Sequence, residues 1–242
     1  MLGDENIITA VIWWAKDKRA AEQEYGHIRD WDTSRVTKMV RLLAGMTDFN
    51  EDISKWNVSG VKDMTQLFDS CANFNQPLDS WDVSGLHCME YIFKNCLKFN
   101  QPLNSWKTGE ATSMKGIFFN CKAFNQDLSK WDVSGVTGMN YAFYNAKSFN
   151  QNLSSWEINK RQFRCLFIFY GSGFTQFGSL SFKFRMKIME MYIVYIGAAL
   201  VFALPIGLVY LAIVDRSIII SFLSFFVLLL IFWLFWKVIL HT

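Results

Sequence analysis

A stretch of twelve residues, FNQPLDSWDVSG at positions 74–85, recurs along the chain at a fixed interval of 25 residues. Near-copies of it begin at Phe49, Phe99, Phe124 and Phe149. The interval holds from Trp31 to Trp156 without one insertion. Because an insertion at a stacked position would displace its neighbours, the fixed length predicts that each copy is one coil of a stack.

The residues that keep the interval are mostly large and apolar. The strictest are Trp31, Trp56, Trp81, Trp106, Trp131 and Trp156, with Met39, Met64, Met89, Met114 and Met139 and with Phe68, Phe93, Phe118 and Phe143. Burying a large side chain contributes about 1.5–3 kcal/mol, so one coil alone does not offset the entropy of ordering it. We therefore expect these residues inside a stack with covered ends. The copy after Trp156 is degenerate, with Arg164 and Ile168 at the methionine and phenylalanine positions.

Within one coil the apolar residues advance mostly in threes, which fits neither a pure strand nor a pure helix. This mixed spacing predicts a short strand at residues 61–64 and a turn of helix at residues 64–71. Equivalent strands of successive coils would pair about 4.8 Å apart as a parallel sheet. The predicted fold class of the repeats is therefore α/β, a solenoid of short parallel strands and helical turns.

The repeat resembles a known family. Its pattern is V-x-x-M-x-x-[ML]-F-x-x-C-x-x-F-N-Q-x-L-x-x-W-[DN]-V-S, preceded by AVIWWAKDKRAAEQEYGHIRDWDTSRVTKM. Over about Ile8 to Trp156 this is similar to the BspA-like class of leucine-rich-repeat proteins, found in bacterial surface proteins, in protists and algae and in large DNA viruses. The resemblance implies a right-handed, leucine-rich-repeat-like solenoid that binds other macromolecules. It implies no reaction.

The composition of the chain changes near residue 188. From there to the end, the charged residues are Glu190, Asp215, Arg216 and Lys237. Met191 to Val214 and Ile218 to Leu240 are each long enough to cross a hydrocarbon core of ~30 Å. They predict an all-α two-helix transmembrane hairpin over residues 188–242, with a buried helical hairpin as the alternative.

Charges flanking the predicted spans indicate an orientation. Lys183, Arg185 and Lys187 precede the first span, and Lys237 ends the second. The positive-inside rule then predicts an integral membrane protein with both termini and the solenoid on the cytosolic side, or on the shell-facing side of a viral internal membrane. The N-terminus lacks the pattern of a secretory signal. Five cysteines with no CxxC pair agree with a reducing compartment.

Four domains follow from these boundaries. Residues 1–30 are expected to form a capping helix for the first coil, with Asp4 or Asn6 at its N-cap. The solenoid of repeats fills residues 31–160. Residues 161–187 are rich in aromatic residues and are expected as a juxtamembrane segment at headgroup level. The transmembrane hairpin completes the chain.

Polar residues also recur, at the expected corners of the coil. Asp82 and its equivalents follow the periodic tryptophan, where an Asx-turn that bonds the next backbone N–H is favoured and a calcium ladder is the alternative. Asn75 and its equivalents follow the periodic phenylalanine and predict a column of amides that bond backbone groups. Cys71, Cys96 and Cys121 would stack along the axis, so buried thiols are favoured over a metal site.

No feature of the sequence indicates an enzyme. The sequence has no Gly-rich phosphate loop, no HExxH motif and no serine nucleophile elbow. We predict no catalytic, cofactor-binding or metal-binding residues and no small-molecule substrate. A net charge of +3 gives no argument for nucleic acid.

The outward positions that differ between coils form the candidate partner-binding face. They are Lys62, Asp63, Gln66, His87, Glu90, Tyr91, Thr112 and Lys115. The predicted function is a non-enzymatic, membrane-anchored repeat scaffold for protein–protein contacts, a structural subunit that links a lipid bilayer to the other proteins of a large assembly. One version is a minor capsid protein of a large DNA virus with an internal membrane. The alternatives are a cell-surface adhesin or receptor, and an accessory subunit of an organelle membrane complex.

Overall fold

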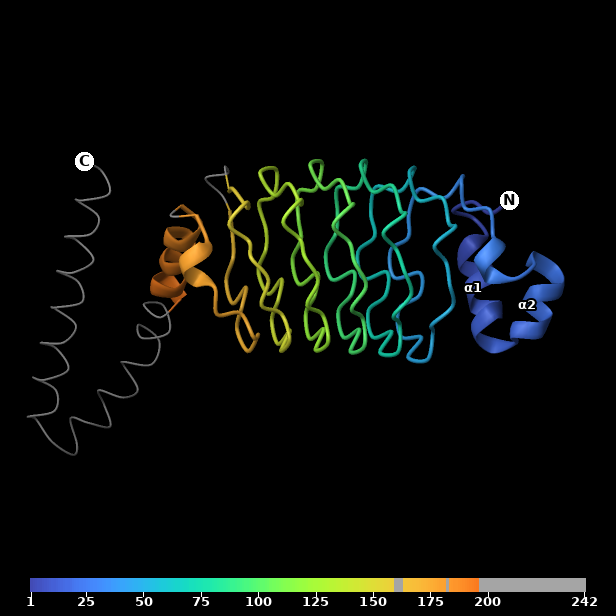
Figure 1. Cartoon of the computed structure of the whole chain (residues 1–242). Helices are drawn as coiled ribbons and strands as arrows, with labels where there is room; N and C mark the ends of the chain where they lie inside the picture. The colour runs from blue at the N-terminus through green and yellow to red at the C-terminus, as the bar shows by residue number, and fades with distance from the viewer. Residues whose placement is uncertain (159–162, 182, 196–242) are drawn as a thin grey trace, which may run out of the picture. The chain divides into compact units, whose positions relative to one another are not determined.

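The computed structural model describes residues 1–158, 163–181 and 183–195 (Figure 1). The chain divides into two compact units, Met1–Tyr192 and Ile193–Thr242. The first unit holds all of the repeats. Of the second unit, only residues 193–195 are among those that the structure describes.

The repeats form coils that lie side by side in the first unit (Figure 1). Parallel β-bridges join equivalent residues of successive coils. They pair Lys38 with Asp63, Asp63 with Cys88, Cys88 with Ser113, Ser113 with Gly138, and Gly138 with Arg164. Each bridge is isolated, because the chain enters a turn immediately after it.

The segment after each bridge is a series of turns whose amides alternate between two kinds of partner. The amides of Met64 and Gln66 donate to the carbonyls of Cys88 and Glu90 in the next coil, at 3.1 and 2.9 Å. The amide of Leu67, which follows Gln66, donates to the carbonyl of Met64 in its own coil, at 3.0 Å. Half of the amides of this segment therefore join neighbouring coils and half close local turns.

Left-handed backbone explains why this segment is not a helix. Two positions in most coils have a positive φ; they are Arg41, Gln66, Tyr91, Gly116, Tyr141 and Phe167, and Gly45, Ser70, Asn95, Asn120, Asn145 and Gly171. An α-helix of L-residues cannot continue through such a residue. Asparagine tolerates this region better than most residues, which accounts for its column at 95, 120 and 145.

The predicted fold class is wrong for the described part of the chain. Within residues 1–158, 163–181 and 183–195 the structure has no β-strand and no sheet, only isolated bridges. Residues 31–158 also contain no helix, so the predicted strand at 61–64 and helical turn at 64–71 are both replaced by turns. The α/β solenoid, leucine-rich-repeat-like or otherwise, and the all-α transmembrane hairpin behind it are therefore not the architecture described here.

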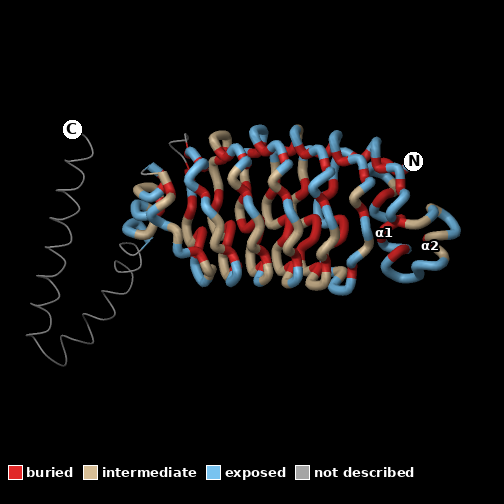
Figure 2. The backbone as a smooth tube through the Cα atoms, in the orientation of Figure 1, coloured by how far each residue is buried: buried red, intermediate tan, exposed pale blue. Residues whose placement is uncertain are grey.

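The buried columns predicted from the interval are confirmed. The periodic tryptophans are at most 5% exposed, and the periodic methionines at most 1%. Phe68, Phe93, Phe118, Phe143 and Phe169 stack with centroids 5.5–5.6 Å apart. A second column stacks at 5.9–6.2 Å and consists of Phe49, Phe74, Phe99, Phe124, Phe149 and Phe174. The burial pattern repeats from coil to coil in Figure 2.

Polar groups inside the stack form hydrogen bonds with a neighbouring coil. The indole Nε1 of Trp106 donates to the carbonyl of Leu78, 28 residues back, at 2.9 Å. The same bond is made by Trp56, Trp81, Trp131 and Trp156. The predicted asparagine column is confirmed, since the Oδ1 of Asn75 accepts from the backbone N–H of Asn100 at 2.9 Å. An unpaired buried donor would cost free energy, so these bonds fix the register of the stack.

Two helices, α1 (Ile7–Lys16) and α2 (Lys18–Tyr25), precede the first coil. Neither Asp4 nor Asn6 caps α1 with its side chain. The Asp4 carboxylate instead accepts from the backbone amide of Thr37 at 2.7 Å, which ties the N-terminal segment to the first coil. The pKa of Asp4 is lowered, first by its hydrogen bond to the Thr37 hydroxyl.

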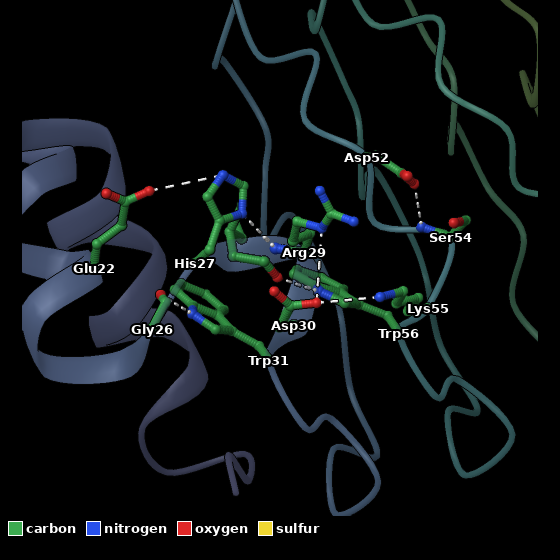
Figure 3. A network of polar contacts seen from close by, with 11 residues as sticks. Glu22, Gly26, His27, Arg29, Asp30, Trp31, Asp52, Ser54, Lys55 and Trp56 are labelled. Carbon is green, nitrogen blue, oxygen red and sulfur yellow. Dashed lines mark hydrogen bonds and ion pairs between the residues drawn. The ribbon is translucent and has the colours of Figure 1, made fainter.

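A 3₁₀ turn, η1 (Ile28–Asp30), joins α2 to the coils (Figure 3). His27 caps this turn, because its Nδ1 accepts from the backbone N–H of Arg29 at 3.2 Å. The carbonyl of Ile28 accepts from the Trp56 indole at 2.8 Å, and Asp30 pairs with Lys55 at 3.3 Å. The turn therefore continues the hydrogen-bond columns of the coils into the N-terminal cap.

A further coil follows the last regular repeat. Cys165 and Phe169, rather than Arg164 and Ile168, take the methionine and phenylalanine positions, because the spacing here is 26 residues from Met139 and Phe143. The bridge from Gly138 to Arg164 and the stack of Phe169 on Phe143 show the shifted register.

The end of the array is covered by a second 3₁₀ turn, η2 (Phe177–Ser179), and by helical residues 183–192. Phe177 packs edge-to-face on Phe174 at 5.2 Å, and Phe184 packs on Phe163 at 5.5 Å. Both ends of the stack therefore have an apolar cover. A repeat array needs such covers, because the apolar surface of its first and last coils would otherwise be exposed to water.

The prediction of an integral membrane protein is corrected by the helices of the structure. No helix among the described residues is long and apolar enough to cross a membrane. Of the first predicted span, Met191 to Val214, only residues 191–195 are described. The rest of that span, and all of Ile218 to Leu240, lie outside the described residues.

Candidate protein-binding face

The outward residues that follow the bridges form one continuous surface, which we call the bridge face. It comprises the exposed and half-buried side chains of residues 37–45, 62–70, 87–95, 112–120, 137–145 and 163–171. All eight candidate partner-binding residues lie on it, and none of them is buried. The partner-binding role assigned to them from the sequence stays a prediction.

The N-terminal part of the bridge face is polar and internally hydrogen-bonded. The Asp63 carboxylate accepts from the backbone N–H of Thr65 at 2.8 Å. The Gln66 amide donates to Asp69 at 3.1 Å and accepts from Arg41 at 3.2 Å. These side chains are held in place by their own coil or by the next one.

Three candidates form a column one residue before the bridges. Lys62, His87 and Thr112 are all exposed. The backbone N–H of His87 donates to the carbonyl of Lys62 at 3.1 Å, and that of Thr112 donates to His87 at 3.0 Å. Their side chains therefore lie on neighbouring coils in register.

The central part of the bridge face is built around Tyr91. The ammonium groups of Lys94 and Lys115 lie 5.8 and 5.6 Å from the centroid of its ring, within the range of a cation–π contact. The ring covers Gly116, where an added Cβ would lie 2.1 Å from the Tyr91 Cε1. A side chain at residue 116 would displace the ring, so glycine here lets Tyr91 lie flat on the next coil. The Glu90 carboxylate accepts from the Ser113 hydroxyl at 2.8 Å.

The C-terminal part of the bridge face carries a contiguous network of aromatic rings, which we call the aromatic cluster. Its members are Tyr91, Phe119, Tyr141, Tyr144, Phe167, Tyr170 and Tyr192. Phe119 stacks on Tyr144 at 4.7 Å, and Tyr144 stacks on Tyr170 at 5.2 Å. None of the seven is buried, and Tyr170 is 56% exposed.

The sequence analysis named Tyr91 but missed the rest of this cluster. The signal was present, since Tyr91 and Tyr141 lie two intervals apart and Phe119 and Tyr144 lie one interval apart. It was missed because only the inward columns were followed through every copy. The column at residues 119, 144 and 170 also includes the 26-residue step into the last coil.

The corner aspartates are structural, as predicted. The Asp82 Oδ1 accepts from the backbone N–H of Ser84 at 3.0 Å, and Asp32 and Asp132 make the same turn. The pKa values of these carboxyls are lowered, first by hydrogen bonds from the serine side chains. Among the described residues, no group of three or more His, Cys, Asp or Glu side chains could hold a metal ion.

The five cysteines divide into four buried thiols and one half-buried thiol on the bridge face. The thiol of Cys121 donates to the carbonyl of Phe93 at 2.7 Å, so it fills the core as predicted. Burial raises the pKa of Cys71 to about 12 and that of Cys165 to about 12. For the half-buried Cys88, burial also raises the pKa, as do the charges of Asp63 and Glu90.

We therefore expect Cys88 alone to react quickly with iodoacetamide in the folded protein near pH 8. The raised pKa lowers the thiolate fraction of all five thiols, but burial also keeps the reagent away from the other four, so only Cys88 is accessible to react. Peptide mapping after timed labelling checks this. The Cys88→Ser variant should lose the fast phase, and unfolding should restore reaction at the other four. Rapid labelling of Cys71 or Cys121 in the folded chain would contradict the assigned packing.

A protein family matches this chain over the repeats. It is DUF285, described as a Mycoplasma protein of unknown function, and the matches cover residues 15–125 and 79–172. Together the two overlapping matches run from residue 15 to residue 172, which is more than half of the 242 residues. The chain belongs to this family. No curated protein and no solved structure matches the chain.

Proposed function

We propose that this protein is a non-enzymatic repeat scaffold that binds other proteins through its bridge face, as a structural subunit of a large assembly. The observation that carries the proposal is the contrast between the inside and the outside of the coils. Inward columns repeat the same residue type, as Phe68, Phe93 and Phe118 do. Outward columns of the bridge face change from coil to coil, as in Lys62, His87 and Thr112.

This contrast matches what a binding scaffold needs. A uniform core allows identical coils to stack, and it leaves the outward positions free to differ without cost to the stack. The bridge face is also held rigidly, because alternate amides of each coil bond the next one. A rigid surface loses little conformational entropy when it binds a partner.

The resemblance to BspA-like repeats, whose members bind macromolecules, agrees with this function and stays a prediction. The absence of catalytic residues also stays part of the proposal. The version in which the assembly is a viral shell rests on the resemblance alone.

Chemical crosslinking of the full-length chain in its native source tests the proposal. Lys62 and Lys115 on the bridge face should give reproducible links to one abundant protein. Lys107 and Lys130 are exposed outside that face and serve as internal controls. Links that come mainly from the control lysines, or that scatter over many proteins, would overturn the assignment of the binding face.

A further inference from the structure

The charges of the last coils are segregated along each coil. Between residues 90 and 148, the segments 90–98, 115–123 and 140–148 contain five lysines and one glutamate, a net charge of +4. The lysines are Lys94, Lys98, Lys115, Lys122 and Lys147. The intervening residues 99–114 and 124–139 contain two lysines and three carboxylates, a net charge of −1. The segments that start on the bridge face and continue three residues beyond it are therefore the basic part of these coils.

The lysines frame the aromatic cluster. Lys94 and Lys115 lie on the Tyr91 ring. Lys122 and Lys147 are exposed, and they follow Phe119 and Tyr144 by three residues in their coils. Two carboxylates lie beside these lysines: Glu90 accepts a hydrogen bond from the Ser113 hydroxyl, and Asp69 pairs with Lys94 at 3.0 Å. Lys115 therefore lies on a ring of the cluster with no carboxylate partner among the described residues, and the exposed Lys122 and Lys147 lie in the same coils as Phe119 and Tyr144.

Rings of the cluster stack on one another from coil to coil. Phe119, Tyr144 and Tyr170 stack on one another with interplanar angles of 4° and 21°. Tyr141 and Phe167 stack at 5.8 Å in the neighbouring column. A ring enclosed in such a stack has little free face for a nucleobase. Its exposed edge is the electropositive part of its quadrupole, and the tyrosine hydroxyls are hydrogen-bond donors.

We infer that the aromatic cluster and its lysines form a docking strip for an acidic segment of a partner protein. Carboxylates of that segment pair with the ammonium groups and accept from the tyrosine hydroxyls, while its apolar side chains pack between the ring edges. Phe119 and Tyr144 supply the apolar contact area that tight protein interfaces concentrate at their centre. This inference rests on the proposed function, because it names the partner class of the same face.

Binding of a labelled peptide to the full-length chain tests the inference. The probe is a fluorescein-labelled peptide with alternating glutamate and phenylalanine, and its control replaces every glutamate with glutamine. Fluorescence anisotropy should show that the acidic peptide binds at least ~10-fold more tightly than the control. Raising the ionic strength from about 0.01 M to about 1 M should weaken it, since the Debye length falls from about 30 to about 3 Å.

Matched variants locate the site. Lys115→Glu with Lys122→Glu should weaken the acidic peptide ~10-fold or more, since each ion pair across an interface is replaced by a like-charge contact. The control pair, Lys107→Glu with Lys130→Glu, changes the net charge equally but outside the face and should have little effect. Tyr170→Ala removes an exposed ring and should weaken both peptides.

Three outcomes overturn the inference: equal binding of the glutamine peptide, equal loss in the control pair, or tighter binding of a single-stranded oligonucleotide or of phosphatidylserine vesicles. The proposed function is judged separately. If crosslinks from Lys62 to the native partner persist unchanged in the Lys115→Glu, Lys122→Glu chain, the acidic-segment inference fails while the bridge face remains the binding surface.

Discussion

Replacing Phe93 with alanine is expected to lower the free energy of unfolding by ~3–5 kcal/mol. The Phe93 ring is fully buried and stacks on Phe68 and Phe118 at 5.6 Å, and on Phe99 at 4.2 Å. Its removal leaves a cavity in the middle of the stack, where coils on both sides depend on the contact. Urea denaturation followed by tryptophan fluorescence measures the change.

Phe119→Ala is the matched control for this variant. Phe119 has the same side chain in the next coil, but it is half-buried on the bridge face. Its truncation should lower the free energy of unfolding by about 1 kcal/mol, which is the typical contribution of an aromatic pair in addition to the burial of its surface. If the two variants lost equal stability, or if Phe93→Ala melted as the parent does, the buried column would not be the core of the stack.

Replacing Asn100 with alanine is expected to lower the free energy of unfolding by about 1–3 kcal/mol. The Asn100 Oδ1 accepts from the backbone N–H of Asn125 at 2.9 Å and from the Gln126 side chain at 3.0 Å. Alanine has no acceptor to offer, so a half-buried N–H in the next coil loses its partner. The loss falls on the junction between two coils and should appear as reduced protection of the backbone amide of Asn125 against hydrogen exchange.

Asn73→Ala serves as its control. Asn73 makes an exposed hydrogen bond, from its Nδ2 to Asp48 at 2.8 Å. Because water replaces this bond, the change should cost about 0.5 kcal/mol or less. An Asn100→Ala chain as stable as the Asn73→Ala chain would show that the asparagine column does not hold the coils together.

The inward half of the fold could be predicted from the sequence because burial imposes a strict period. Trp106 and Phe118 must each meet an identical neighbour, so their interval identifies them as stacked and buried. The indole column at Trp106 adds a hydrogen bond that the interval alone does not reveal.

The local backbone could not be predicted in the same way. Gln66, Tyr91 and Tyr141 adopt positive φ values of 58°, 55° and 62°. None of these residue types favours that region, so nothing in the sequence marks the left-handed positions that break a helix. In the stack, alternate amides form hydrogen bonds to the next coil. These bonds stabilise a left-handed conformation that the segment would not adopt in isolation. The predicted strands and helical turns failed for this reason.

The sequence alone predicted part of the candidate binding face. Outward residues such as Lys115 follow from the period once the inward ones are known, and the structure places all eight candidates on one surface. The aromatic cluster was harder to find, because Gly116 interrupts one of its columns and the interval changes to 26 before Phe167. The cluster also depends on contacts between coils that the interval does not reveal, such as the Tyr91 ring covering Gly116.

The central claim is that residues 25 apart in the sequence are neighbours on one continuous face. Paired cysteines test it most directly. In a Cys88→Ser background, Thr112→Cys with Thr137→Cys should form a disulfide under mild oxidation. The backbone N–H of Thr137 donates to the Thr112 carbonyl at 2.8 Å, which places these residues on adjacent coils. At a spacing of about 4.8 Å, adjacent coils fall within the Cα separation that a disulfide spans.

Lys62→Cys with Thr137→Cys lies in the same column but three coils apart, at about 14 Å on the same spacing. The account predicts rapid crosslinking of the first pair and none of the second, as measured by the mobility and mass of the oxidised chain. Equal oxidation of both pairs, or oxidation of the distant pair alone, would contradict the stacked register and with it the proposed binding face.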